Sequence, residues 1–318
     1  MKIALDVMGG DHAPWETVAG ALQWAKSSSS QLILVGKADI IEQELKGCSY
    51  DHEQISIVHS PQVMEMNDSV SALRRKMDSS IAVATRLVKE KKADAVVSCG
   101  STGAQMAAAI FILGRLETIE RPPIVALVPG VAGTVTLLLD VGANVDCKPQ
   151  QLLQFAILGK VYSSILNGLS NPRVALLNNG EEESKGNSLS FATHKILKEQ
   201  SDINFIGNIE GRDLFSNKSD VVVCDGFTGN ILLKSLEGVA KFIGKACMEE
   251  LGALPGVFQQ FDFSRVGGAP LLGVNGVSIV CHGSSKREAV FSGIKIAEQC
   301  VAREMVQRQT LALGAVRE

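Results

Sequence analysis

Residues 173–186 read RVALLNNGEEESKG, an apolar run that leads directly into a loop rich in glycine and charged residues. The run at 174–178 lacks the alternation of apolar and polar residues, which is typical of a strand covered on both faces. The loop has three interpretations: a metal or acid/base site, an anion site around Lys185, or a solvated charge run. The stretch therefore predicts a buried strand that ends in a loop able to carry chemistry.

The same pattern recurs along most of the 318 residues, where short β-rich runs alternate with longer stretches of helical periodicity. This alternation predicts a layered α/β/α fold with a largely parallel sheet, built as one large domain over 1–318 or as two lobes. We expect strands at 2–7, 32–36, 55–58, 93–98, 124–128, 135–141, 174–178, 221–224 and 277–280. We expect helices at 15–27, 79–91, 102–116, 150–166, 188–200, 230–251 and 285–308.

The composition restricts the class of partner and the compartment. The chain is 46% hydrophobic and 20% charged with a net charge of −3, so it has no basic excess and nucleic acid is not an expected partner. Its seven cysteines show no C-x-x-C pair and no zinc or disulfide spacing, which favours a reducing cytoplasm. MKIALDV enters a strand pattern at once, so we expect no signal peptide, and the apolar runs are too short to predict a membrane-spanning helix.

Six glycine-rich loops follow predicted strands. The carboxyl ends of strands in an open parallel sheet form the ligand crevice, and glycine lets the backbone approach a ligand closely. Tight turns and helix N-caps explain any single loop equally well, but we expect all six at one end of one sheet. The loops are 6–11 (DVMGGD), 98–103 (SCGSTG), 140–144 (DVGAN), 178–186 (NNGEEESKG), 225–230 (DGFTGN) and 281–286 (CHGSSK).

The loops lack the common nucleotide and hydrolase signatures. There is no G-x-G-x-x-G after the first strand, no Walker A lysine and no G-x-S-x-G elbow. Carboxylates at strand ends, such as Asp6 and Asp140, can bind magnesium, but they also cap turns, and we expect no metal. An anion-binding crevice is the remaining prediction.

Two residues in these loops are candidates for the chemistry. His282 precedes Gly-Ser-Ser at an expected helix start, where a histidine can act as an acid or base, although a lone histidine is more often structural. Lys185 can bind a phosphate oxygen, and we expect Glu181 and Glu182 to hold its ammonium group in place.

Residues 236–265 interrupt the alternation and predict a helical hairpin. Its first part is amphipathic, with Lys241 and Lys245 on one face, and it leads into LGALPGVFQQF. The hairpin either packs on the core or a second subunit, or dips an apolar tip into a bilayer surface. The tip residues are Leu254, Val257, Phe258 and Phe261.

As a set, the loops resemble the bacterial phosphate acyltransferases that make acyl phosphate from acyl carrier protein for phospholipid synthesis (the PlsX family). The resemblance covers nearly the whole chain. Two departures are Cys99 and Ser101 where the family commonly reads Ala and Asn, and Ser69-Val70 where it usually has an acidic residue and proline. The matching segments are 6–14, 73–80, 97–104, 138–144, 176–186, 224–234 and 267–285.

The resemblance implies a fold similar to isocitrate and isopropylmalate dehydrogenases and to phosphotransacetylase. It also implies a homodimer, peripheral membrane association through the hairpin, and fatty acyl transfer from acyl carrier protein to inorganic phosphate without a cofactor. The rivals are an acyl-coenzyme A enzyme like phosphate acetyltransferase and a noncatalytic acyl-binding scaffold.

Within the matching segments we expect two groups of site residues. The catalytic group is His282, Lys185 and Asn230. The substrate-binding group is Asp6, Gly9, Gly10, Arg74, Gly100, Ser101, Thr102, Gly103, Asn144, Asn179, Gly180, Glu181, Glu182, Asp225, Gly229 and Ser284.

Overall fold

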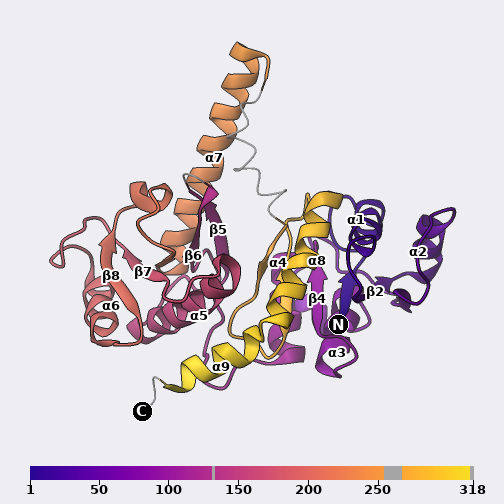
Figure 1. Ribbon diagram of the computed structural model, residues 1–318, viewed down its shortest axis with the longest axis horizontal. Coiled ribbons are helices and arrows are strands. Elements are labelled where there is room, and N and C mark those ends of the chain that lie inside the picture. Colours follow the sequence, from indigo (N-terminus) through magenta and orange to yellow (C-terminus); the bar gives the residue numbers. More distant parts are fainter. Residues whose placement is uncertain (131–132, 254–266, 316–318) are drawn as a thin grey trace. The chain divides into compact units, whose positions relative to one another are not determined.

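The chain folds into two compact α/β units, each with a sheet of its own. The computed structural model describes residues 1–130, 133–253 and 267–315. Unit 1 comprises Met1–Arg115 and Phe263–Val306, and unit 2 comprises Leu116–Asp262 and Gln307–Glu318. The predicted layered, largely parallel α/β fold is confirmed (Figure 1). The expectation of one sheet is wrong. Apolar runs in the sequence indicate which segments form buried strands, but they do not indicate which strands pair with each other.

Unit 1 contains a six-stranded sheet in the order β10-β11-β4-β1-β2-β3. Five strands run parallel, and only the two-residue β10 is antiparallel to its neighbour. Successive residues of β1 are fully buried on opposite faces, which explains why the strand reads as a continuous apolar run. The strands are β1 (Lys2–Asp6), β2 (Gln31–Gly36), β3 (Ile55–His59), β4 (Ala95–Ser98), β10 (Ala269–Pro270) and β11 (Val277–Val280).

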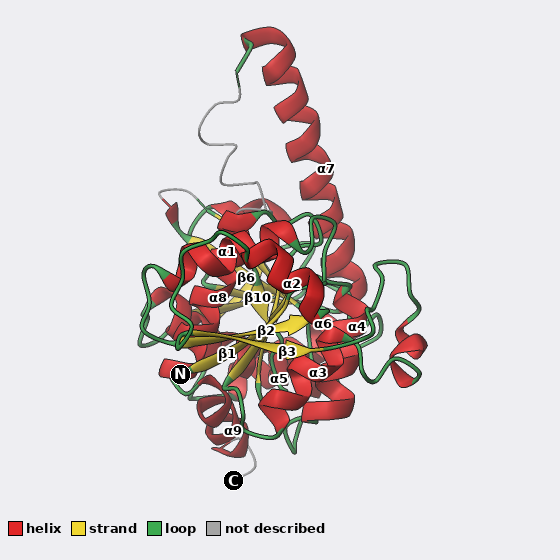
Figure 2. Cartoon of the chain, turned by 90° about the vertical axis from the view of Figure 1, so that its right-hand side faces the viewer, coloured by secondary structure: helices red, strands yellow, loops and turns green. Residues whose placement is uncertain are grey.

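Helices cover both faces of the unit 1 sheet (Figure 2). Helix α3 packs with α4 on one face, where Ala4 and Val96 join the core. Helices α1 and α8 pack together so closely that a Cβ on Gly20 would lie 2.6 Å from Val290 Cβ. The helices are α1 (Trp15–Ala25), α2 (Ala38–Leu45), the 3-10 helix η1 (Val70–Arg74), α3 (Ser80–Lys89), α4 (Thr102–Ala108), the π-helix η2 (Ala109–Leu113) and α8 (Arg287–Ala302).

Three of these helices differ from the sequence prediction. Helix α2 was not expected, and it buries only Ile41 and Leu45. The helix expected at 102–116 ends at Leu113, because Gly114 adopts φ +88°. The helix expected at 285–308 is divided into α8 and α9 (Met305–Ala315), with Glu304 at φ +53° between them.

Unit 2 contains a five-stranded sheet in the order β5-β6-β9-β7-β8. Strand β5 is antiparallel to β6, and the other pairs are parallel. Leu138, Ala175 and Val222 from the three central strands form one side of its core. The elements are β5 (Val125–Pro129), β6 (Val135–Leu139), α5 (Pro149–Asn167), β7 (Arg173–Leu177), α6 (Ser188–Glu199), β8 (Asn204–Ile209), the 3-10 helix η4 (Gly211–Phe215) and β9 (Val221–Val223).

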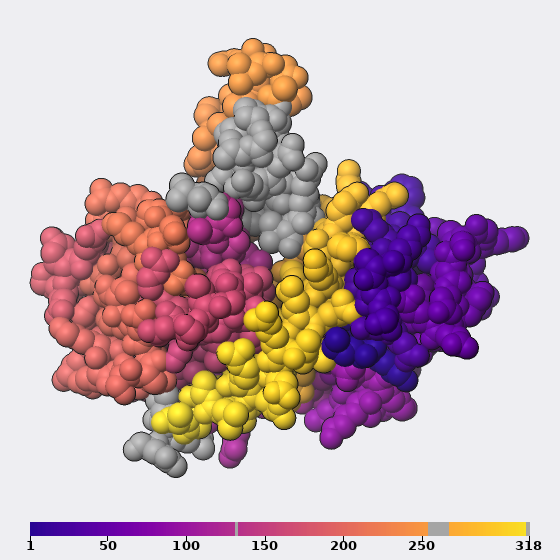
Figure 3. Space-filling view, viewed as in Figure 1, coloured from indigo at the N-terminus to yellow at the C-terminus, as the bar shows by residue number. Residues whose placement is uncertain are grey.

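Helix α7 (Gly226–Leu251) starts directly after β9 and buries only Gly226 and Gly229. Its outer end lies beyond the other described atoms of unit 2 (Figure 3). Large apolar side chains on it are exposed, including Phe242 at 75% and Leu251 at 66%. The predicted tip residues Leu254, Val257, Phe258 and Phe261 lie outside the described residues, so the hairpin at 236–265 stays a prediction. Among the described helices, none has both the length and the apolarity to cross a bilayer.

Candidate functional site

The six glycine loops divide into two sets of three. In unit 1, the loops follow β1, β4 and β11, which are neighbours in the sheet and parallel. In unit 2, they follow β6, β9 and β7, which are also neighbours and parallel. Each set therefore gathers at the carboxyl edge of its own sheet, where parallel α/β sheets bind ligands.

In unit 1, glycines allow the three loops to touch. A Cβ on Gly9 would lie 2.8 Å from the Gly100 nitrogen, and a Cβ on Gly10 would lie 3.0 Å from Cys99 Cβ. Gly10 also has φ +110°, a conformation that favours glycine. The Asp11 N–H donates to the Gly283 carbonyl over 2.8 Å and joins the first loop to the third.

The Asp6 carboxyl group links the first two of these loops through hydrogen bonds. Its side chain is 2% exposed and accepts hydrogen bonds from Ser98 Oγ at 2.7 Å and from the Met8 N–H at 3.2 Å. Burial raises the pKa of the Asp6 carboxyl, an effect only partly offset by these donors. The Gly100 N–H in turn donates to Ser98 Oγ over 3.0 Å. Asp6 thus fixes the loops, and its contacts leave it little freedom to bind substrate.

His282 is exposed and is held by a residue two positions away. The Ser284 N–H donates to His282 Nδ1 over 3.2 Å, and Ser284 Oγ lies 2.8 Å from the same nitrogen. Because Nδ1 accepts from a backbone N–H, the neutral ring carries its proton on Nε2. Nε2 is therefore the donor of the neutral ring, and Ser284, predicted to bind substrate, contacts His282 through both its backbone N–H and its hydroxyl.

The start of α4 lies beside the same loops. The first N–H groups of a helix have no acceptor within the helix, so Thr102 and Gly103 offer donors after the half-buried Ser101. A Cβ on Gly103 would lie 2.9 Å from Val70 Cγ2, so η1 packs against this turn. At the end of η1, the Arg74 guanidinium lies 5.5 Å from the Phe111 ring centroid, within cation–π range.

In unit 2, Asp140 organises the loop after β6, in the turn-capping role that is one of the two alternatives for carboxylates at strand ends. Its fully buried carboxylate accepts from the N–H groups of Ile124, Gly142, Ala143 and Asn144, and from Asn144 Nδ2 at 2.8 Å. Asn144 Nδ2 also donates to the Pro122 carbonyl over 3.3 Å. The Asn144 amide nitrogen is thus used inside the loop. The sequence Asp-Val-Gly-Ala-Asn at 140–144 is the available signal, because aspartate commonly accepts hydrogen bonds from nearby backbone N–H groups in turns.

The loop after β9 is the start of α7. Asp225 caps this helix, with Oδ1 accepting from the Thr228 N–H at 2.9 Å and Oδ2 from Thr228 Oγ1 at 2.8 Å. A Cβ on Gly229 would overlap the Asp140 carbonyl, so glycine is required there for packing. Asn230 is exposed beside Gly142, and its side chain makes no hydrogen bond within the described part of the chain.

The loop after β7 carries the predicted Lys185. Its ammonium group forms no ion pair with any described residue, so the expected pairing with Glu181 and Glu182 is wrong. Glu181 pairs instead with Lys218 at 3.0 Å, and Glu183 pairs with Lys198 at 2.6 Å. These two glutamates are solvated surface groups, whereas Lys185 is exposed and available to an anion.

Gly180 leaves room for two other side chains of this loop. A Cβ on Gly180 would lie 2.7 Å from Lys185 Cγ and 3.0 Å from Glu182 Oε2, so both side chains pack against this glycine. Asn178 Nδ2 donates to the Lys185 carbonyl over 3.0 Å and closes the loop. Asn179 is exposed next to it.

A pocket of about 420 Å³ opens at the carboxyl ends of β7 and β9. Its volume lies within the usual range of small-molecule sites. Two of the predicted substrate-binding residues, Asn179 and Asp225, line it. The full lining is Leu152, Leu176, Leu177, Asn178, Asn179, Gly186, Asn187, Leu189, Ser190, Cys224, Asp225 and Thr228.

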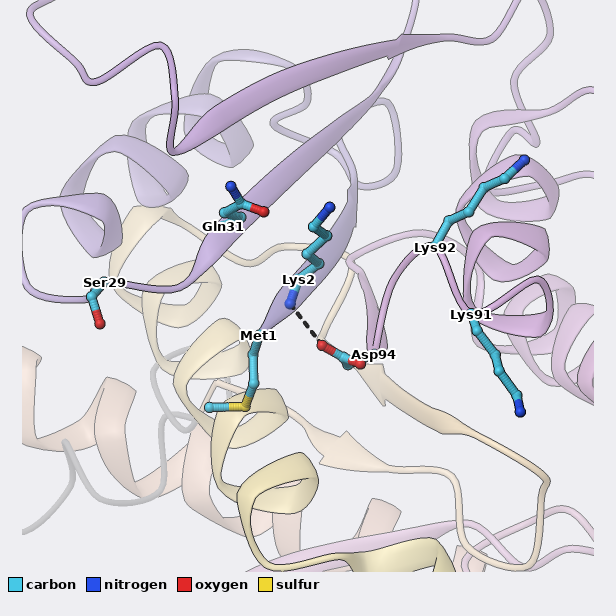
Figure 4. Close-up of a pocket in the computed structure, with 7 residues that line it drawn as sticks. All are labelled: Met1, Lys2, Ser29, Gln31, Lys91, Lys92 and Asp94. Carbon is cyan, nitrogen blue, oxygen red and sulfur yellow. Dashed lines mark hydrogen bonds between the residues drawn. The ribbon is translucent and has the colours of Figure 1, made fainter.

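A second pocket, of about 730 Å³, lies at the amino ends of the unit 1 strands, at the opposite edge from the glycine loops. It contains Lys2, Lys91, Lys92 and Asp94, and the Lys2 N–H donates to Asp94 Oδ2 over 2.8 Å (Figure 4). It holds none of the predicted site residues. Within the described ranges, no group of three His, Cys, Asp or Glu side chains has the arrangement of a metal site.

Comparison with known proteins places the chain in a family. Residues 1–308 match the family described as fatty acid synthesis protein. A phosphate acyltransferase of Syntrophomonas wolfei is 60% identical over 99% of both chains. One from Desulforamulus reducens is 49% identical over 96% of this chain and 95% of its own. The chain belongs to this family of phosphate acyltransferases and is an enzyme of the acyltransferase class.

Solved structures show the same fold at low identity. A phosphotransacetylase from Streptococcus pyogenes superposes with a TM-score of 0.65 at 16% identity, over 95% of this chain and 94% of its own. A branched-chain phosphotransacylase from Enterococcus faecalis gives 0.59 at 17% identity, over 95% and 99%. At these identities the likeness concerns the fold alone, and it agrees with the predicted phosphotransacetylase-like architecture.

Proposed function

We propose that this enzyme transfers a fatty acyl group from acyl carrier protein to inorganic phosphate and releases acyl phosphate for phospholipid synthesis. The names of the relatives and the fatty acid synthesis family support an acyl donor and phosphate as acceptor. The observation that carries the proposal is the hydrogen bond from the Ser284 N–H to His282 Nδ1, because it leaves Nε2 as the ring nitrogen that can donate to a substrate.

The reaction needs no nucleophile from the protein. A phosphate oxygen attacks the thioester carbon, and a tetrahedral oxyanion forms. The C–S bond then breaks and releases a thiolate, whose parent thiol has a pKa of about 8.5. Nε2–H of His282 donates to the oxyanion or to the leaving sulfur, and solvent supplies the proton that converts the thiolate to the thiol. The exposed first-turn N–H groups of α4 are further donors for a developing negative charge.

Phosphate is already charged near neutral pH, so it requires positioning and charge compensation rather than a strong base. We assign charge compensation to Lys185, whose ammonium has no ionic partner among the described side chains. The side-chain amide of Asn230 lies beside Gly142 and has no hydrogen-bond partner among the described residues, so we assign it a polar contact with substrate.

Helix α7 supports two further parts of the proposal, homodimer formation and peripheral attachment of a cytoplasmic enzyme to the membrane. Phe242 and Leu251 expose large apolar surfaces, and Lys241 adds a positive charge that forms no ion pair with a described residue, whereas Lys245 is paired with Glu249 at 3.7 Å. Such a combination binds anionic bilayer surfaces, because apolar groups enter the headgroup boundary while lysines meet the lipid charges.

One assay separates the proposed function from its rivals. The purified protein is incubated with phosphate and either acyl carrier protein thioester or acyl-coenzyme A, and acyl phosphate is trapped with hydroxylamine. Product from the carrier thioester at the higher kcat/KM is expected. A marked preference for acyl-coenzyme A would indicate the acetyltransferase-like alternative, and no product from either donor would indicate a noncatalytic acyl-binding protein.

A further inference from the structure

The pocket of unit 2 has an apolar interior and a polar mouth. Leu152, Leu176 and Cys224 are buried at its base, and Leu177 and Leu189 form half-buried walls. Burial raises the pKa of the Cys224 thiol well above its ordinary value, so this side chain stays neutral and behaves as a small apolar group. The polar side chains that line the pocket come from the ends of β7 and β9 and from the starts of α6 and α7.

The charges of the lining exclude phosphate as the occupant. No lysine, arginine or histidine is among the lining residues, and the only ionisable polar group is the Asp225 carboxylate. A carboxylate repels an anion, and the nearby Lys185 does not line the pocket. The lining also has no aromatic ring on which a nucleobase can stack. The interior therefore suits an uncharged, flexible, apolar group.

Most polar groups at the mouth already have partners. Asp225 is engaged by Thr228, and Asn178 Nδ2 donates to the Lys185 carbonyl. Ser190 Oγ donates to Asn187 Oδ1 over 3.1 Å. The Asn179 side chain, by contrast, makes no hydrogen bond within the described part of the chain, so its amide is available to a carbonyl at the mouth.

We infer that this pocket binds the hydrocarbon chain of the acyl donor, with the thioester at the mouth near Asn179, and that Leu189 sets the preferred chain length. This inference rests on the proposed acyl transfer and adds to it the site that binds the hydrocarbon chain. Each methylene group that enters an apolar pocket is worth about 0.8 kcal/mol, so each one lost costs about fourfold in kcat/KM.

Leu189 is suited to a test because it lies half-buried in the first turn of α6 and no catalytic role is assigned to it. Leu189→Trp reduces the volume, and Leu189→Asn keeps the size but makes the wall polar. Ala192→Trp is the matched control, because Ala192 is exposed on the same helix and does not line the pocket. The kcat/KM values for butyryl, octanoyl and palmitoyl thioesters of acyl carrier protein are measured for each variant.

Both Leu189 variants are expected to lower the ratio of palmitoyl to butyryl kcat/KM by about tenfold or more, with Ala192→Trp unchanged. An unchanged ratio in both variants would overturn the inference. One form of this outcome is an equal fall in kcat/KM at every chain length, which would place the carrier's own prosthetic arm in the pocket.

A binding measurement separates this inference from the proposed function. Titration of the uncharged methyl esters of palmitic and butyric acid into the wild-type protein and into Leu189→Asn is read by calorimetry without turnover. Tighter binding of methyl palmitate that is lost in Leu189→Asn supports the chain site even if no acyl phosphate forms. Equal affinity of the two proteins for methyl palmitate would overturn the inference even if the enzyme is fully active.

Discussion

The backbone N–H of Ser284 donates to His282 Nδ1 over 3.2 Å, so the tautomer of His282 is set by the main chain as well as by the Ser284 hydroxyl. The loop that carries both residues is joined to the first glycine loop by the Asp11 to Gly283 hydrogen bond. The orientation of the imidazole thus depends on the packing of the glycine loops of unit 1.

This relationship predicts unequal effects for two substitutions. His282→Ala removes the donor, and turnover should fall by about 10²-fold or more, the usual size for a positioned acid/base group. Ser284→Ala removes only one of the two contacts to Nδ1, so the rate should fall by about tenfold or less. Steady-state kinetics with acyl carrier thioester and phosphate measures both. Near-normal turnover in His282→Ala would return this residue to a structural role.

Lys185 should act on phosphate rather than on the acyl donor. Lys185→Ala is expected to raise the KM for phosphate by about tenfold or more, because a charge-assisted hydrogen bond to the anion is lost, while the KM for the thioester changes little. Lys198→Ala is the matched control, since this lysine belongs to the same unit but is paired with Glu183 at 2.6 Å. If both variants raise the phosphate KM equally, Lys185 has no specific role.

The sequence predicted the strands well because most of them are buried on both faces and read as uninterrupted apolar runs. Strand β8 was missed for the opposite reason: it lies at the sheet edge, is partly exposed, and reads NFIGNI with Gly207 at φ +96°. The division into two sheets was beyond prediction, because it depends on pairings such as Leu5 with Val97 that connect distant segments.

The candidate site was predicted to a similar extent. Glycine-rich loops after strands are visible in the sequence, since close backbone approach requires glycine. The partner of Glu181 was not visible, because Lys218 lies 37 residues away and reaches it only through the fold. The number of hydrogen bonds to Asp140 was not visible either, because four of its five donors depend on the geometry of the 140–144 loop and the fifth is the Ile124 N–H, 16 residues away.

Asp6 predicts a particular dependence of stability on pH. Burial raises the pKa of its carboxyl in the folded state, so the folded protein holds this proton at pH values where the unfolded chain, with a pKa of about 3.9, has released it. The contribution of Asp6 to the free energy of unfolding is therefore greatest below the unfolded pKa and is lost as the pH rises through the folded pKa.

Asp6→Asn removes this titration while keeping the shape of the side chain. Urea unfolding across a pH series should show that the wild-type free energy of unfolding falls more steeply with rising pH than that of Asp6→Asn. Asp94→Asn serves as the control, because Asp94 lies at the opposite edge of the same sheet. Parallel curves for wild type and Asp6→Asn would contradict a raised pKa.

The last prediction concerns where the enzyme works. Phe242 and Leu251 are the most exposed large apolar side chains of α7, at 75% and 66%. An acyl phosphate with a long chain is poorly soluble, so release at a membrane surface would favour its use by a membrane-bound acyl transfer. Replacing both residues with glutamate should abolish co-sedimentation with anionic liposomes, because a charged group does not enter the apolar boundary. Acyl phosphate synthesis in solution should stay largely intact.

The control for this variant is Lys234→Ala, which alters an exposed lysine of the same helix that is paired with Glu237 at 2.9 Å. It should keep liposome binding. Sedimentation velocity of both variants separates the two interpretations of α7. If the glutamate variant binds liposomes normally but changes from dimer to monomer, the exposed face of α7 is a subunit interface and the membrane contact lies elsewhere. If it loses liposome binding as a dimer, α7 is the part of the enzyme that meets the lipid surface.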